Sequence, residues 1–291
     1  MKKVTVAALQ MKCTTDITEN LSTAKRLTAA AAEKGANIIL LPELFETQYF
    51  CQERQYEYYD FARSVDKNAA VTLFRKLAKE LSVVIPLSFY ERDKNVLYNS
   101  VAVIDADGEI LGVYRKTHIP DDHCYQEKFY FTPGNTGFKV WNTKYAKIGI
   151  GICWDQWFPE AARCMAIDGA QLLFYPTAIG SEPILECDSM PHWRRCMQGH
   201  AAANILPVIA ANRYGVENVQ PCAENAGQHS SLNFYGSSFI CGETGEIVES
   251  ASRDGEEILI HEFDLDKIDK ARVDWGLFRD RRPECYFKIT E

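Results

Sequence analysis

The sequence predicts an α/β fold in which two β-sheets pack face to face and helices cover them. Three observations favour this fold. Roughly ten strand-like apolar segments occur among four or more helix-like stretches, one strand–helix–strand unit occurs twice, and ten strands are more than a single sheet of typical size contains. No Ser/Gly/Pro-rich linker or charge block divides the 291 residues, so we expect a single domain over residues 1–291.

The repeated unit spans residues 4–42 in its first copy and 146–176 in its second. Each copy consists of an apolar strand, a helix, a Gly-Ala pair, a second apolar strand and a proline. A glycine after a helix is typical of a left-handed cap, and a short apolar run is typical of a strand buried on both faces. Proline ends such a strand because it has no N–H for the ladder. The residue after each proline, Glu43 or Thr177, is therefore expected at a strand end, where open sheets bind ligands.

Further strands are expected outside the two copies, and two glycine-containing turns, Asp107-Gly108 and Glu243-Thr244-Gly245, connect some of them. These strands are expected at residues 82–89, 100–105, 109–114, 207–212, 237–241 and 257–263. Together with the repeated units, they account for the strand count on which the two-sheet prediction depends.

Charge and composition narrow the function classes. The chain is 46% hydrophobic and 25% charged, as in ordinary globular proteins, and its net charge of -8 disfavours a nucleic-acid partner and favours a small cationic substrate. No apolar run approaches the ~18 residues of a membrane span, and no secretion-signal pattern is visible at the N-terminus. We therefore expect a cytoplasmic location and no membrane partner.

The ten cysteines are expected to be reduced and mostly small core residues, because the chain shows no export signal. None of them lies in a Cys-x-x-Cys pair, a frequent zinc-ligand spacing. The spacing of His192, Cys196 and His200 places all three near one face of a helix, which suits either three metal ligands or a buried helix face with two polar members. The second interpretation is favoured, so we expect neither a metal site nor disulfides.

Cys153 ends the expected strand over residues 146–153 and precedes a polar and aromatic turn and a helix at 160–168. Such a turn projects a thiol into a cleft, directs the next backbone N–H towards an oxyanion, and lowers the thiol pKa through the helix N-terminus. Most cysteines in a reduced protein are inert core residues, so this feature by itself leaves both interpretations open.

Glu43 and Lys116 lie at two other expected strand ends, where each would ordinarily be a solvated surface charge. Their coincidence with Cys153 changes the interpretation, because acyl transfer needs a nucleophile, a proton acceptor and a fixed positive charge. The three residues together predict a catalytic site.

The sequence around these three residues resembles the nitrilase, or carbon-nitrogen hydrolase, superfamily. The resemblance lies in three motifs that occur in the family's order: Leu41-Pro42-Glu43, Tyr114-Arg115-Lys116-Thr117-His118 and Gly151-Ile152-Cys153-Trp154-Asp155. It implies a four-layer α-β-β-α sandwich, a catalytic Glu43-Lys116-Cys153 triad and no cofactor. It also implies a second glutamate near the triad, and Glu127 occupies the matching position.

Longer stretches resemble the members of that superfamily that hydrolyse N-carbamoylputrescine, a small cationic carbamoyl amine of polyamine biosynthesis. These stretches are residues 125–131, 153–163, 175–183, 192–195, 234–239 and 278–283. In the implied mechanism Glu43 accepts the Cys153 proton, and Lys116 and the Trp154 N–H hold the oxyanion. The products are the diamine, ammonia and carbon dioxide. The resemblance also implies a homo-oligomer, with the C-terminal tail of about 265–291 at a subunit interface.

A substrate with an ammonium end requires a carboxylate some methylene groups away from the reacting carbon, because a buried ammonium without a partner is costly. Glu182 is the first candidate, and Asp121 and Asp122 are alternatives. The aromatic residues expected to wall the methylene chain are Tyr49, Tyr125 and Trp154.

Two alternatives remain open. A carbamoylase for a β-ureido acid or an amino acid would need a cation for the substrate carboxylate, which Arg194 or Arg195 could supply. A catalytically silent binding protein would react slowly and evenly with iodoacetamide, whereas an enzyme would react selectively at Cys153.

Overall fold

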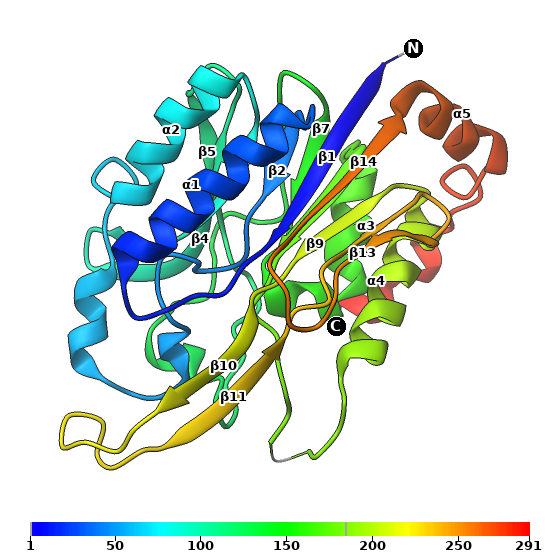
Figure 1. Ribbon diagram of the computed structural model, residues 1–291. Coiled ribbons are helices and arrows are strands. Elements are labelled where there is room, and N and C mark those ends of the chain that lie inside the picture. Colours follow the sequence, from blue (N-terminus) through cyan, green and yellow to red (C-terminus); the bar gives the residue numbers. More distant parts are fainter. Residues whose placement is uncertain (1, 184) are drawn as a thin grey trace.

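Two facing β-sheets form the centre of the computed structural model, which describes residues 2–183 and 185–291 (Figure 1). The first sheet has the order β14-β1-β2-β3-β4-β5, in which backbone bonds at Val84 join β2 to β3. Its strands are β1 (Lys3–Gln10), β2 (Ile38–Leu40), β3 (Ile85–Asp93), β4 (Val96–Ile104), β5 (Ile110–Arg115) and β14 (Glu257–Asp264).

The second sheet has the order β6-β7-β8-β9-β12-β13, and it repeats the first sheet strand for strand. In both sheets the second, third and fourth strands of the order run parallel, and the outer neighbours are antiparallel. The strands are β6 (Val140–Asn142), β7 (Lys147–Ile150), β8 (Leu172–Pro176), β9 (Val208–Ala211), β12 (Phe239–Cys241) and β13 (Ile247–Ser250). The internal repeat seen in the sequence therefore extends to all six strands of each sheet.

Helices cover the outer face of each sheet. Figure 1 shows α1 (Ile17–Glu33) and α2 (Ala69–Leu81) on one side, and α3 (Pro159–Ile167) and α4 (Met190–Asn204) on the other. Three apolar cores lie between these four layers of helices and sheets. Leu27 and Phe74 belong to the core under α1 and α2, and Trp193 belongs to the core under α3 and α4. Val6 and Ile150 belong to the core between the two sheets. The predicted four-layer α-β-β-α sandwich is confirmed.

Local signals explain where the helices begin and end. The Asp16 carboxylate accepts hydrogen bonds from the N–H groups of Thr18 and Glu19 at the start of α1, which is a regular N-cap. Gly35 and Gly169 follow α1 and α3 with φ of +91° and +89°, as the Gly-Ala pairs predicted. The last helix, α5 (Leu265–Trp275), begins at the end of β14.

The sequence interpretation differs from the structure in several strands, and it gave no range for β6 or β13. The strand expected over 146–153 ends at Ile150, because Cys153 begins a short 3-10 turn, η4 (Cys153–Trp157). The strand expected at 82–89 runs from Ile85 to Asp93 and forms a hairpin with β4. The antiparallel ribbon of β10 (Tyr214–Val219) and β11 (Ser230–Tyr235) was not predicted; half of the residues in each strand are polar, and neither strand lies in a sandwich sheet.

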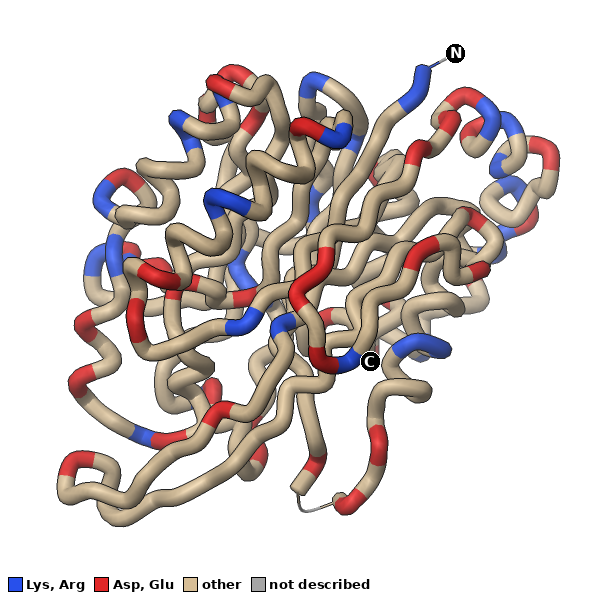
Figure 2. The backbone as a smooth tube through the Cα atoms, in the orientation of Figure 1, with Lys and Arg blue, Asp and Glu red and all other residues tan. Residues whose placement is uncertain are grey.

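Charged residues lie mainly on the helices, the loops and the strand ends, and the two signs are interspersed in the view of Figure 2. This distribution agrees with the absence of a strongly basic character in the sequence. No helix in the described part of the chain is long and apolar enough to cross a membrane.

Candidate active site

Four of the residues expected at the site come together between the two sheets. Glu43 follows β2, Lys116 follows β5, Cys153 follows β7, and Glu127 begins the 3-10 turn η3 (Glu127–Phe129). The repeat contributes directly to this convergence, because the Glu43 N–H donates to the carbonyl of Thr177, its counterpart in the second copy (3.3 Å). The site therefore lies at the strand ends, as the sequence indicated.

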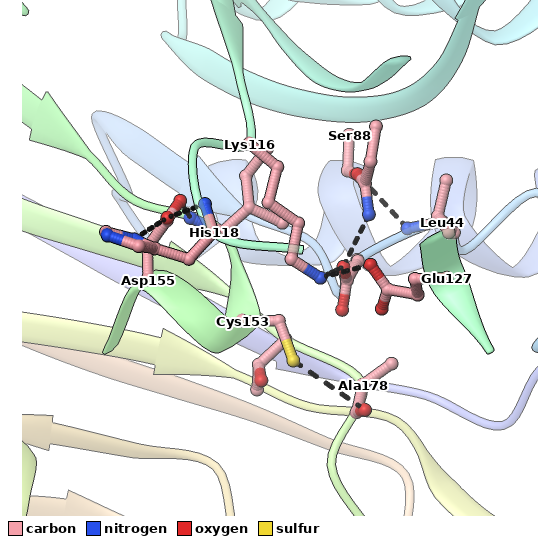
Figure 3. Close-up of polar contacts among 12 residues, drawn as sticks. Leu44, Ser88, Lys116, His118, Glu127, Cys153, Asp155 and Ala178 are labelled. Atoms are coloured by element: carbon pink, nitrogen blue, oxygen red, sulfur yellow. Dashed lines mark hydrogen bonds and ion pairs between the residues drawn. The ribbon is translucent and has the colours of Figure 1, made fainter. Parts of the chain in front are cut away.

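Lys116 lies fully buried between two carboxylates. Its Nζ is 2.8 Å from Glu43 Oε1 and 2.6 Å from Glu127 Oε2, and none of the three side chains is exposed. Burial opposes the lysine charge, but the carboxylates of Glu127 and Glu43 outweigh burial and hold the pKa of Lys116 well above its usual value. Figure 3 shows the ammonium group directed towards Glu127. Lys116 is therefore a permanent positive charge beside the cysteine.

Glu127 is held by a second donor. The Tyr49 hydroxyl donates to Glu127 Oε1 at 2.6 Å. Burial raises the pKa of Glu127, and the negative charge of Glu43 raises it further, although Lys116 opposes both. Tyr49 differs here from the expectation, since it is buried behind the carboxylate and is not among the residues that line the cleft.

The Glu43 carboxylate has one engaged and one available oxygen. Oε1 accepts hydrogen bonds from Asn99 Nδ2 at 2.6 Å and from Lys116. Oε2 is buried and accepts no hydrogen bond from the residues that the structure describes. A buried acceptor without a donor is costly, and it is suited to receive a proton during a reaction.

The turn at Cys153 is held by Asp155. Cys153 has φ of +42°, a conformation that is costly for a residue with a side chain. Asp155 Oδ2 accepts from the Ile152 N–H (2.9 Å) and the Tyr114 hydroxyl (2.7 Å), while Oδ1 contacts the N–H and Nδ1 of His118 (3.0 and 2.8 Å). Asp155 thus ties the cysteine turn to the segment that carries the lysine.

The surroundings of Cys153 favour its neutral thiol over the thiolate. Burial raises its pKa well above the usual range, the Glu43 charge raises it further, and Lys116 lowers it. The expectation of a lowered pKa was wrong, because burial and the two carboxylates outweigh the helix terminus and the lysine. A nucleophile of this kind needs a neighbouring base to remove its proton.

Cys153 lies at the wall of a cleft of about 770 Å³. Four of the predicted substrate-binding residues line the same cleft, namely Glu182, Trp154, Tyr125 and Asp121. Asp122, Lys128 and Arg195 line it too, whereas Arg194 is turned away and donates to Ser250 Oγ (2.6 Å). Burial, assisted by the charge of Asp122, raises the pKa of Glu182 to about 7.

The His192, Cys196 and His200 face of α4 serves packing and hydrogen bonding. His200 Nε2 lies 2.7 Å from the carbonyl of Gln156, Cys196 Sγ contacts the same carbonyl at 3.5 Å, and the His192 ring packs on Trp157. No group of three potential ligands is arranged for a metal ion in the part of the chain that the structure describes.

Comparison with known proteins identifies the family. The carbon-nitrogen hydrolase family model matches residues 5–273. The chain belongs to the carbon-nitrogen hydrolase family. It is 58% identical to the N-carbamoylputrescine amidase of Solanum tuberosum (97% of this chain, 93% of the relative) and 52% identical to the citrullinase of Francisella tularensis (100% and 99%). A carbon-nitrogen hydrolase from Helicobacter pylori G27 has a TM-score of 0.90 with 38% identity and 99% coverage of both chains.

As a carbon-nitrogen hydrolase, the chain is an enzyme acting on amide-type bonds, and its nitrilase-like sandwich agrees with the solved structures. The sequence did not indicate the roles of Asp155 and Asn99. For Asp155 a signal was available, since an acid two residues after a nucleophile at a turn is placed to accept backbone N–H groups. For Asn99 no local pattern marks the contact with Glu43.

Proposed function

We propose that this chain hydrolyses N-carbamoylputrescine to putrescine, ammonia and carbon dioxide. The amidases of Solanum tuberosum and Solanum lycopersicum, which share 58% and 57% identity with it, carry this activity in their names. Its cleft is lined by Cys153 and by the carboxylates of Asp121, Asp122 and Glu182, and the buried cluster of Lys116, Glu43 and Glu127 lies outside that lining. This arrangement suits a carbamoyl group with a cationic tail.

The reaction begins with transfer of the Cys153 proton to Glu43 Oε2, the available oxygen. The thiolate attacks the carbamoyl carbon, and Lys116 together with the Trp154 N–H stabilises the oxyanion. Glu43 then protonates the departing nitrogen. Water activated by Glu43 or Glu127 cleaves the thioester-like intermediate, and the carbamate that forms loses carbon dioxide without further catalysis.

The position of Glu182 in the cleft is the observation that supports the substrate proposal most strongly. It lines the same cleft as Cys153, and burial together with Asp122 raises its pKa to about 7. An ammonium group placed beside this carboxylate would stabilise its charged form. Glu182 therefore suits the far amine of the substrate, while Tyr125 and Trp154 suit the methylene chain between the two ends.

Glu182→Gln tests this assignment. We expect KM for N-carbamoylputrescine to rise by at least about tenfold with a smaller change in kcat, since the contact is made equally in ground and transition states. In the wild type, kcat/KM should fall as the pH drops below about 7, because Glu182 loses its charge there. That limb should be absent in the variant. Glu186→Gln, the same change at an exposed position of the same loop, is the control.

An unchanged KM in Glu182→Gln would reject Glu182 as the amine partner. Asp121→Asn and Asp122→Asn would then be tested in the same assay, because both residues line the cleft. An equal rise of KM in Glu186→Gln would show that the loop, and not the carboxylate, is responsible.

Citrulline is the second candidate substrate, because the citrullinase relative aligns with the whole chain. Citrulline has the same carbamoyl amine with an additional α-carboxylate, and Arg195 and Lys128 in the cleft are cations that could meet it. The acids Asp121, Asp122 and Glu182 in the same cleft disfavour that carboxylate, since like charges in contact are repelled.

An ammonia-release assay across N-carbamoylputrescine, citrulline and β-ureidopropionate decides between these candidates. We expect kcat/KM to be at least about tenfold higher for N-carbamoylputrescine than for the two acids, in accordance with the excess of carboxylates in the cleft. A preference for citrulline that disappears in Arg195→Met would overturn the proposal and assign the carboxylate contact to Arg195.

The C-terminal tail of residues 265–291 is the proposed self-association surface. Val273, Trp275, Phe287 and Ile289 are large apolar side chains there, with exposed fractions between 58% and 77%. Exposed apolar side chains that gather in one segment are typical of protein–protein contacts. Light scattering of wild type and Trp275→Ser should show a homo-oligomer that the variant weakens. A monomeric wild type would reject this interface.

A further inference from the structure

A buried ion pair lies at the base of the β10–β11 ribbon. Arg213 Nη1 is 2.9 Å from Glu217 Oε1, and the two side chains are 0% and 7% exposed. The guanidinium also lies near the rings of Tyr49 and Phe234, 5.9 and 5.4 Å from their centroids. Burial of a charge pair is costly unless further hydrogen bonds satisfy its polar groups. Both terminal nitrogens of Arg213 have such partners, whereas Nε is buried without a partner among the described residues.

The remaining partners of Arg213 belong to a single segment, residues 43–49. Arg213 Nη2 donates to the carbonyls of Glu43 (2.7 Å) and Leu44 (3.0 Å), and Nη1 donates to the carbonyl of Thr47 (3.2 Å). Three carbonyls of the segment that carries the general base therefore point at one guanidinium.

Glu217 contacts the other end of the same segment. Its Oε2 accepts the N–H of Tyr49 at 2.5 Å, and the hydroxyl of Tyr49 donates to Glu127. The ion pair therefore reaches both glutamates that bind Lys116. It contacts Glu43 directly at the backbone carbonyl, and it reaches Glu127 through Tyr49.

The backbone of this segment would not keep its shape by itself. Leu44 has φ of +48°, a left-handed conformation that is unfavourable for a residue with a branched side chain. Its N–H donates to Ser88 Oγ at 3.0 Å (Figure 3), and its carbonyl is one of those bound by Arg213. Such a conformation persists where the surroundings impose it.

We propose that the Arg213–Glu217 pair is a positioning clamp that sets the placement of Glu43 against Cys153 and of Glu127 against Lys116. The two residues do not touch the substrate cleft, so they act through the 43–49 segment. The inference rests on the proposed roles of Glu43 and Glu127. Because Glu217 lies in β10, the proposal gives the β10–β11 ribbon a part in positioning the catalytic residues.

Glu217→Gln tests the clamp, because an amide has one acceptor oxygen and cannot serve both Arg213 and the Tyr49 N–H. We expect kcat for N-carbamoylputrescine to fall by at least about tenfold with KM changed by less than about twofold, since small misplacements near the reacting groups are costly in rate. Alkylation of Cys153 by iodoacetamide should slow by a similar factor, because Glu43 must take the thiol proton. Glu217→Asp keeps the charge but shortens the reach, and its kcat should lie between those of Glu217→Gln and wild type.

Ile268→Ala is the control for lost stability. Ile268 is a buried residue of α5, at the other end of the molecule from the ribbon (Figure 1). All proteins are assayed at a temperature where circular dichroism shows them folded. Ile268→Ala should lower Tm and leave kcat and the alkylation rate at wild-type values.

A kcat and an alkylation rate of folded Glu217→Gln within twofold of wild type would overturn the clamp, and so would an equal loss in Ile268→Ala. Should Glu217→Gln not fold, Glu217→Asp carries the same comparison. The alkylation rates do not depend on the substrate, so they test the clamp separately. If the wild type does not hydrolyse N-carbamoylputrescine but alkylation of Cys153 is slower in Glu217→Gln than in the wild type, the substrate is refuted and the clamp is supported.

Discussion

Replacing Lys116 with methionine tests the electrostatics of the site most directly. The side chains have similar length, but the ammonium between Glu43 and Glu127 is lost. Breaking a buried pair by removing one partner costs about 3–5 kcal/mol, because the remaining charges lack compensation. With an unfolding entropy of about 2.1 cal/mol/K per residue, a chain of 291 residues loses about 1.6 °C in Tm for each kcal/mol. The expected decrease in Tm is therefore about 5–8 °C.

The decrease in Tm should depend on pH. Burial already raises the pKa of Glu127, and Lys116 is the main group that opposes this rise, so its removal raises the pKa of Glu127 further. A carboxyl group with a raised folded-state pKa binds more protons when folded than when unfolded between the two pKa values. Stability therefore falls as pH rises through that window, by up to about 1.4 kcal/mol per pH unit. Lys116→Met should be closer to wild type at pH 6 than at pH 8.

Thermal unfolding at pH 6, 7 and 8 measures this effect, and ammonia release measures the accompanying loss of activity. We expect kcat/KM to fall about 10²–10³-fold, the usual effect of removing one oxyanion stabiliser. Lys25→Met, on the exposed face of α1, is the matched control and should change stability by less than about 0.5 kcal/mol. A Tm deficit of Lys116→Met that is below 2 °C at pH 8, or that does not shrink towards pH 6, would refute the reasoning.

Three further variants test neighbouring contacts. Cys153→Ala should retain less than about 0.1% of wild-type kcat and a nearly unchanged fold, and activity above a few per cent would sink the nucleophile assignment. Tyr49→Phe leaves Glu127 Oε1 without its 2.6 Å donor. The free energy of unfolding measured by denaturant titration should therefore fall by about 1–3 kcal/mol, and kcat should decrease. If neither quantity changes, Tyr49 does not position Glu127. Asp155→Asn places an N–H₂ group against the donors of Ile152, Tyr114 or His118. A similar loss of stability should therefore accompany a lower kcat. Wild-type values of both would show that Asp155 does not support the turn at Cys153.

The repeat with its two helices and the positions of the three motifs could be predicted from the sequence because they depend on local patterns, whereas α2 and α5 were not placed. The Gly-Ala pair of the first copy predicted the end of the first helix, and α1 ends at Glu33, two residues before Gly35. The β10–β11 ribbon was missed because β10 alternates only weakly between apolar and polar residues and because both strands are short and lie outside the sandwich sheets. Local pattern predicts a strand best where one face is buried.

The sequence by itself determined which residues stand at the strand ends, so Glu43, Lys116 and Cys153 could be named before any coordinates were known. Only the tertiary structure decided how they interact. Asn99, Tyr49 and Arg213 reach the two glutamates across 56 to 170 residues of chain, and no local pattern marks such contacts. The direction of the Cys153 pKa shift was decided in the same way, since burial and neighbouring carboxylates raise the pKa where the turn alone predicted a lowered one. The sequence specifies which chemical groups are present. The distances between them and their burial, which set the strength of their electrostatic interactions and the size of their pKa shifts, arise only when the two sheets pack together.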